Sequence, residues 1–140
     1  MAVTKVLARG WALTVGAGLV AVGGINSITF SGGKTDAETT TFASAGWAEH
    51  IVAERTRSIS VEGFFLEDSA TGDRDAGQEA IETLNDAVGA DSIGEFTLTS
   101  PGGTVYSFDG SVEVGDIGGG NNDPTSWSAT ITVTGEITVT

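Results

Sequence analysis

The sequence contains no cysteine, two prolines and one histidine among its 140 residues. The absence of cysteine excludes disulfide bonds, thiolate metal sites and cysteine nucleophiles. A Ser-His-Asp triad or a histidine-ligated metal would depend on His50 alone, and no G-x-S-x-G motif is present. We therefore expect a protein that is not an enzyme, with no catalytic residues, no metal and no other cofactor.

Positive charge is also scarce, and it is confined to the first half of the chain. The six basic residues lie between Lys5 and Arg74, and the net charge of the whole chain is −13. Residues 75–140 contain eleven acidic residues and no basic residue. A surface of this charge repels phosphate backbones, so we expect no specific binding of nucleic acid. No apolar stretch reaches the ~20 residues of a membrane helix, so no membrane partner is expected.

Glycine, in contrast, is abundant. The chain has 21 glycines, with 39% hydrophobic and 18% charged residues, which is typical of a folded protein with many turns. A length of 140 residues fits one domain, spanning residues 1–140. We expect a mainly β domain that is stabilised by packing and by assembly.

Alternation of apolar and polar residues predicts strands along most of the chain. The final stretch, Thr125 to Thr140, alternates most strongly, with Trp127 and Ile131 on one face and Thr130 and Thr132 on the other. It is much longer than a usual strand of about 5–6 residues. Glycine-containing turns predict that several strands pair as hairpins. The predicted strands are 9–15, 19–22, 25–30, 56–66, 93–99, 104–114 and 125–140.

One amphipathic helix is predicted at about residues 75–88. Asp75 is suited to be its N-cap, and Gln78, three residues later, completes a capping-box pattern. Ile81, placed one turn before Leu84, begins an apolar stripe along the helix. We expect this helix to flank the sheet.

Residues 31–55 lose the strand pattern, which predicts a long loop. Loops of this length in small domains are usually functional or disordered. Phe42 and Trp47 argue against simple disorder, because exposed aromatic side chains are better explained by a surface against which they dock. We infer that this surface belongs to another subunit.

Three weaker patterns are interpreted as structural. Ser31–Thr35 lacks the first glycine of a phosphate-binding loop, where Ile28 stands instead. Residues 116–124 offer oxygen ligands without the spacing of an EF-hand, so a flexible hairpin loop is favoured over a calcium site. Asp109 and Glu113 lie four residues apart on one strand face, where solvated carboxylates are expected rather than a glycosidase pair.

The ordered set of these segments resembles a major tail tube protein of a long-tailed, siphovirus-like bacteriophage. No single segment carries the resemblance, which extends over nearly the whole chain. Its segments are GGINSITF (23–30), TTTFASAGWAEH (39–50), TRSISVEGFF (56–65), GQEA (77–80), FTLTSPGG (96–103), GSVEV (110–114) and WSATI (127–131).

The resemblance implies an antiparallel β-sandwich or partial barrel with one flanking helix. It further implies that six copies form a ring, and that the rings stack into a tube that conducts DNA during genome ejection. The protein would reside in the virion tail after assembly in the cytoplasm of the host bacterium. Its partners would be further copies of itself and the tape-measure, tail terminator and distal tail proteins, and no C-terminal decoration domain is expected.

The resemblance also implies roles for two sets of residues. The long loop would contact the neighbouring ring through Thr39, Thr40, Thr41, Phe42, Trp47, Glu49 and His50. The lumen of the tube would be lined by the polar sides of two strands, and both strands are expected to contribute. These lumen residues are Asp109, Ser111, Glu113, Ser128, Thr130, Thr132, Thr134 and Glu136.

Two alternative functions stay open. The first is the inner tube of a contractile tail or secretion system, which shares the fold in the family picture. The second is a secreted carbohydrate-binding or adhesin β-sandwich module, which would be expected to expose a patch of aromatic side chains on one sheet face. The three tryptophans, Trp11, Trp47 and Trp127, are instead scattered along the chain.

Overall fold

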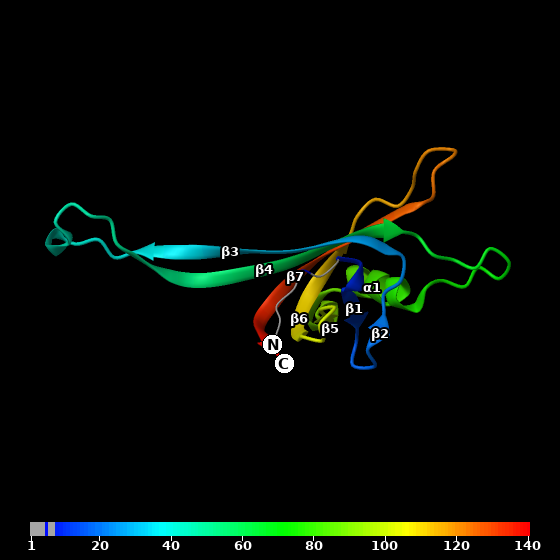
Figure 1. Ribbon diagram of the computed structural model, residues 1–140, viewed down its shortest axis with the longest axis horizontal. Coiled ribbons are helices and arrows are strands. Elements are labelled where there is room, and N and C mark those ends of the chain that lie inside the picture. Colours follow the sequence, from blue (N-terminus) through cyan, green and yellow to red (C-terminus); the bar gives the residue numbers. More distant parts are fainter. Residues whose placement is uncertain (1–4, 6–7) are drawn as a thin grey trace.

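The computed structural model describes residue 5 and residues 8–140 (Figure 1). Its strands form one antiparallel sheet in the order β2-β1-β5-β6-β7-β4-β3. Their bounds are Ala12–Val15 (β1), Val20–Ala21 (β2), Ile25–Glu38 (β3), His50–Phe64 (β4), Gly94–Thr99 (β5), Val105–Val114 (β6) and Ser126–Val139 (β7). The helical elements are α1 (Ala76–Asp86) and the short 3-10 helices Ala8–Gly10, Phe42–Ser44 and Gly89–Ser92.

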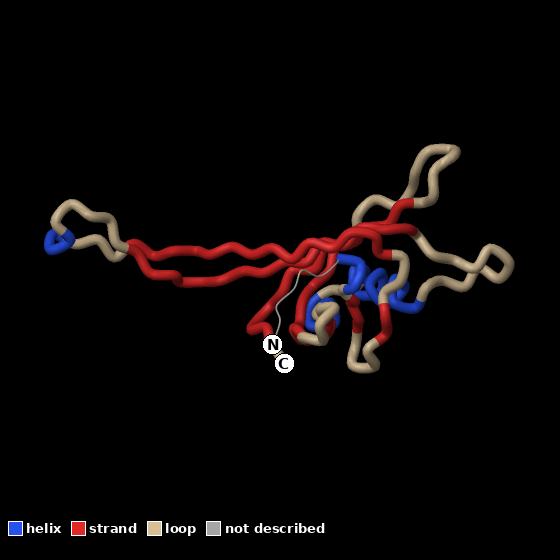
Figure 2. Tube along the Cα trace, in the orientation of Figure 1, coloured by secondary structure: helices blue, strands red, loops and turns tan. Residues whose placement is uncertain are grey.

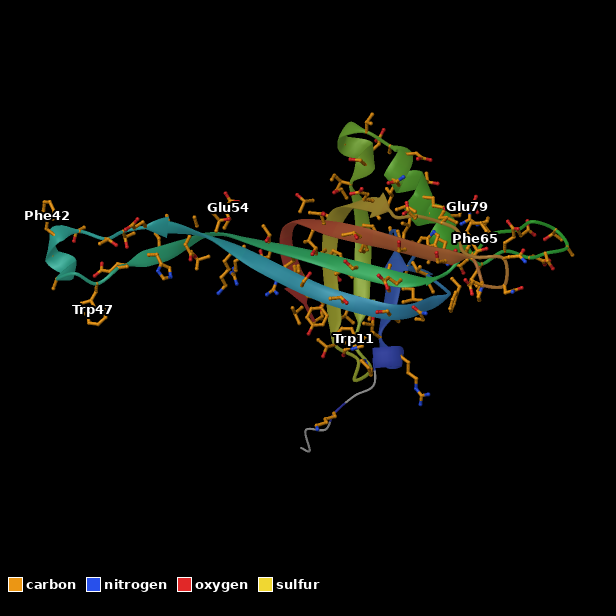
Figure 3. The ribbon with its side chains drawn as sticks, turned by 90° about the horizontal axis from the view of Figure 1, so that it is seen from above. Trp11, Phe42, Trp47, Glu54, Phe65 and Glu79 are labelled. Carbon is orange, nitrogen blue, oxygen red and sulfur yellow. The ribbon has the colours of Figure 1, made fainter. Side chains whose placement is uncertain are left out.

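The predicted mainly β class with one flanking helix is confirmed. The two alternatives of a sandwich and a partial barrel resolve into a single open sheet that curls without closing (Figures 1 and 3). Its curl is evident from Phe30 of β3, whose ring centroid lies 5.9 Å from that of Tyr106 of β6 although β4 and β7 separate these strands in the sheet. Trp11, which precedes β1, stacks on the same tyrosine at 6.1 Å.

The apolar face of the sheet and helix α1 enclose the core. Ile59 of β4, Ile131 of β7 and Ile81 of α1 are completely buried, and they belong to one cluster with side chains of β1 and β5. The helix lies against β6 and β1. Asn85 fixes its C-terminal end, because the Asn85 side-chain oxygen accepts a hydrogen bond of 3.1 Å from the Val114 amide of β6.

The start of α1 is tied to the sheet by a buried glutamine. Asp75 is the predicted N-cap, and its carboxylate accepts a hydrogen bond of 3.1 Å from the Gln78 amide. The Gln78 side chain does not complete a capping box. It is completely buried, and its amide group donates to the carbonyls of Phe64 (2.8 Å) and Gly23 (3.0 Å) while its oxygen accepts from the Leu66 amide (3.1 Å). One side chain thus satisfies three backbone groups from two segments.

The predicted loop at residues 31–55 is mostly wrong, because strands occupy both of its ends. β3 continues to Glu38 and β4 begins at His50, so residues 39–49 alone connect the two strands. The end of β3, the connection at residues 39–49 and the beginning of β4 leave the body of the molecule as a long hairpin, which we call the arm (Figure 2). Both faces of the arm are exposed, so its sequence has no apolar alternation although its two strands pair with each other.

Replacement of Gln78 by alanine should destabilise the fold strongly. The change removes the partners of three backbone groups, and each buried group left unpaired costs about 1–3 kcal/mol. We expect the free energy of unfolding to fall by about 3 kcal/mol or more, measured by urea denaturation followed by circular dichroism. Glu79→Ala, at the exposed neighbouring position, is the control and should stay within about 0.5 kcal/mol of wild type. Equal midpoints for the two variants would contradict this role of Gln78.

Candidate assembly surfaces

One face of the sheet is polar across six strands, and we call it the polar face. Cross-strand pairing sets its rows: Ser111 of β6 pairs with Thr132 of β7, which pairs with Ser58 of β4. Ser58 pairs in turn with Ser31 of β3, and their hydroxyl oxygens are 3.0 Å apart. The face comprises Thr14, Ser27, Thr29, Ser31, Thr56, Ser58, Ser60, Glu62, Glu95, Thr97, Thr99, Ser107, Asp109, Ser111, Glu113, Ser128, Thr130, Thr132 and Thr134.

The polar face carries carboxylates and hydroxyls but no cation. All positions of these strands lie in the described part of the chain, and neither lysine nor arginine occurs among those that make up this face. The basic residues of the sheet are Lys34, Arg55 and Arg57. Arg55 and Arg57 precede the buried Ile59 by four and two residues, so they lie on the face opposite the polar face. Lys34, the cross-strand partner of Arg55, lies there too.

Seven of the eight residues expected to line a lumen lie on the polar face. Glu113 pairs with Thr130, Asp109 pairs with Thr134, and Ser128 pairs with Glu62 of β4. Glu136 follows an interruption in the pairing of β6 and β7, and it lines one hollow with Ser107 and Asp109 of this face and another with Arg55 and Arg57. The register of the strands places the seven residues on one face. That the eight residues line a lumen stays a prediction.

The residues expected to contact a neighbouring ring lie at or beside the far end of the arm. We call this end, residues 39–49, the tip. Hydrogen bonds close the base of this tip. Thr39 donates its amide to the Glu49 carbonyl (2.9 Å), and the Thr40 hydroxyl accepts from the Glu49 amide (2.9 Å) and donates to the Glu49 carbonyl (3.3 Å). Phe42 is fully exposed and Trp47 is 78% exposed. In Figure 3 these two side chains project from opposite sides of the tip.

The remaining residues of this set surround the base of the tip. His50 is the first residue of β4, and its Nε2 lies 3.7 Å from a carboxylate oxygen of Asp36. Thr41 precedes the 3-10 helix that contains Phe42. The tip therefore combines a hydrogen-bonded base with aromatic side chains that are exposed and do not pack in the core.

A hollow at the root of the arm was not predicted from the sequence. It measures about 720 Å³ and lies where the arm leaves the body, on the side of the sheet opposite the polar face. Its lining residues come from five separate parts of the chain, so no local sequence signal could have revealed it. They are Trp11, Phe30, Arg55, Arg57, Tyr106, Gly135, Glu136, Ile137 and Val139.

No group of three or more histidine, cysteine, aspartate or glutamate side chains in the described part of the chain could hold a metal ion. In the same residues, no helix is both long and apolar enough to cross a membrane.

The fold is similar to that of chains in several tail and injection assemblies. A chain in the tail of an empty gene transfer agent particle with C6 symmetry matches at a TM-score of 0.78 and 19% identity, covering 97% of this chain and 99% of that one. A chain of the virion of a native gene transfer agent particle matches at 0.75 and 17%, with the same coverage. No family model matches the sequence, and neither does any curated protein.

Chains of two contractile injection assemblies are also similar. One is from the sheath/tube terminator of an extracellular contractile injection system, with a TM-score of 0.63 at 9% identity over 100% of this chain and 99% of that chain. The other is from the baseplate of the anti-feeding prophage, with a TM-score of 0.62 at 8% identity over 100% and 97% of the two chains. At such identities the likeness shows a common fold, which is that of these tail and injection-system chains.

The tip aromatics should contribute nothing to the stability of the isolated subunit. Phe42→Ala combined with Trp47→Ala should leave the free energy of unfolding within about 0.5 kcal/mol of wild type, because both side chains are exposed. Trp127→Ala, at a 1% exposed core position, should cost about 3–5 kcal/mol. Circular dichroism during urea titration measures both. A large loss in the double variant would show that the tip packs within its own chain.

Proposed function

We propose that this chain is a structural, non-enzymatic subunit of a tail tube in a phage or phage-like particle. Six copies form a ring, and rings stack into a tube that conducts DNA. The observation that carries the proposal is the cation-free polar face on a sheet with the fold of tail chains. The C6 symmetry of the similar gene transfer agent tail supports six copies per ring.

The polar face is suited to line a conduit for DNA. Its short hydroxyls are hydrated, and its carboxylates, among them Glu62, Asp109 and Glu113, repel phosphate groups. No lysine or arginine from its strand positions is available to hold the backbone. DNA therefore passes along this face through electrostatic repulsion and a water layer, without a specific binding site.

The open sheet also supports assembly into rings. β2 and β3 are its edge strands, and the body part of β3 presents unpaired backbone groups on one side. Exposed edges of this length invite pairing with another chain, and a closed ring removes them. Pairing between neighbouring copies extends the sheet, and with it the polar face, around the lumen.

The arm is the proposed contact between rings. It extends far beyond the body of the subunit and ends in exposed aromatic side chains (Figures 1 and 3). The ends of the tube are the places at which tape-measure, terminator and distal tail proteins bind in this proposal. The protein then resides in the virion tail.

An inner tube of a contractile system is the second candidate, favoured by the likeness to the two contractile injection assemblies. The higher TM-scores for the gene transfer agent chains favour the first candidate. No comparable observation supports a carbohydrate-binding module, because Phe64 is the single aromatic residue among the described strand positions in register with the polar face. A test is whether the particle's purified tail contains a sheath protein around the tube.

Negative-stain microscopy of the purified protein tests self-assembly, and wild type should form hollow tubes or six-fold rings. A variant without the arm tip tests whether the arm joins one ring to the next. Residues 39–49 can be replaced by Asn-Gly, because Glu38 and His50 are cross-strand partners that a two-residue turn can join. This variant should retain its circular dichroism spectrum and form rings that do not stack. A wild type that stays a monomer at all concentrations counts against the tube, and long tubes from the variant count against the arm.

Lysines introduced on the polar face should make assembled tubes retain DNA. Thr132→Lys with Thr134→Lys places two cations per copy on the proposed lumen wall, where they bind phosphates in a salt-dependent manner. Tubes assembled from this variant in the presence of short duplex DNA should retain it after gel filtration at low salt and release it at high salt. Asn121→Lys with Asn122→Lys, in the exposed connection between β6 and β7, is the charge-matched control. Equal retention by both variants would refute the lumen assignment.

A further inference from the structure

Three cations at the root of the arm form no ion pair with an acidic residue in the described part of the chain. Lys34 and Arg55 lie directly opposite each other on β3 and β4, an arrangement of like charges that destabilises a strand pair. Arg57 lies two residues further on, with its guanidinium carbon 5.5 Å from the centroid of the Phe30 ring. The ion pairs within 4.0 Å in the described part of the chain involve other residues, namely His50 with Asp36 and Arg74 with Glu82.

The hollow at the root places these arginines beside an apolar surface. Arg55 and Arg57 line it together with the stacked rings of Trp11 and Tyr106 and with one acidic residue, Glu136. Val139, also part of its lining, is 59% exposed. Two cations against one acidic residue leave the hollow with a net positive charge in a chain of net charge −13, and its aromatic surface stays open. Its chemistry fits an aromatic side chain accompanied by a carboxylate.

The tip of the arm has the complementary chemistry. Residues 39–49 contain one acidic residue, Glu49, and no lysine or arginine. Trp47 is exposed, and Glu49 follows it two residues later. Figure 3 shows Trp47 on the side of the arm on which Trp11 lies. The arm is therefore basic and hollowed at its root, and acidic and aromatic at its tip.

The tip cannot reach the hollow of its own chain. Ten residues separate Trp47 from Arg57 along the chain, which corresponds to about 33 Å of extended strand, and the arm is a paired hairpin that projects away from the body (Figure 1). The tip of one copy can instead reach the hollow of a second copy. Each copy then gives its tip to one neighbour and receives the tip of another.

We propose that the root hollow is the receptor for the arm tip of a copy in the adjacent ring. Trp47 of one copy packs against Trp11 and Tyr106 of the next, and Glu49 pairs with Arg55 and Arg57. This inference rests on the proposed tube and adds the receiving site of the contact between rings. The two surfaces differ, so the contact is head-to-tail and repeats without closing, as growth of a stack requires.

Charge reversal tests the contact. Glu49→Arg and Arg57→Glu should each raise the protein concentration needed for tube growth roughly tenfold or more, because each leaves like charges facing each other in the interface. The double variant restores an opposite pair and should regain most of the growth. Glu54→Arg is the matched control, because Glu54 pairs with Thr35 on the other face of the arm and should assemble as wild type. Circular dichroism checks that every variant is folded.

The outcomes separate this contact from the proposed function. Wild-type tubes together with normal tubes from Glu49→Arg would overturn the contact and leave the tube standing. Loss of stacking in both single variants without recovery in the double variant would also overturn it, because the hollow would then receive another occupant. A wild type that forms neither rings nor tubes would instead refute the proposed function itself.

Cross-linking provides a second test that does not depend on charge. The chain has no cysteine, so Ala48→Cys at the tip and Val139→Cys in the hollow introduce one thiol each. A disulfide dimer should form when the two variants are mixed under oxidising conditions, and to a much smaller extent in either variant alone. Ser69→Cys in place of Val139→Cys is the control. Equal dimer yields with Ser69→Cys and Val139→Cys would overturn the proposal.

Discussion

The pairing of β4 with β7 on one side and β3 on the other is the constraint on which the whole structure depends. Ile59 pairs with Ile131 and with Phe30, which places apolar side chains of three strands on one face. A shift by one residue would turn Ser58 and Ser60 into the core. Gly63 holds the end of β4 against the β2–β3 connection, because a side chain there would overlap the Gly24 carbonyl.

The same pairing separates the charges of the protein. Acids and hydroxyls of β4, β6 and β7 share the polar face, and the basic residues of the arm lie on the other face. In the proposed tube, the wall of a DNA conduit and the contact between rings need surfaces of opposite charge. The alternation of β3 and β4 would provide both surfaces, since these strands begin in the body and continue into the arm.

Where side chains are buried on one face, the structure follows the sequence closely. The strand ending in Val139 and the helix capped by Asp75 were predicted nearly to their bounds, because burial imposes a period on their sequences. The arm was predicted as a loop because both of its faces are exposed and no period is imposed. Gln78 was predicted as a capping residue, but its burial turned it to the backbone of other segments.

The sequence by itself determined the two-faced strands, the single helix, the shortage of cations and the exposed character of Phe42 and Trp47. Each of these follows from local composition or from a period of two or 3.6 residues. The tertiary structure alone decided the curl of the sheet, the continuity of the polar face over six strands and the hollow at the root of the arm. These features join segments far apart in the chain, and their relative positions depend on strand register and sheet twist, which no local pattern encodes.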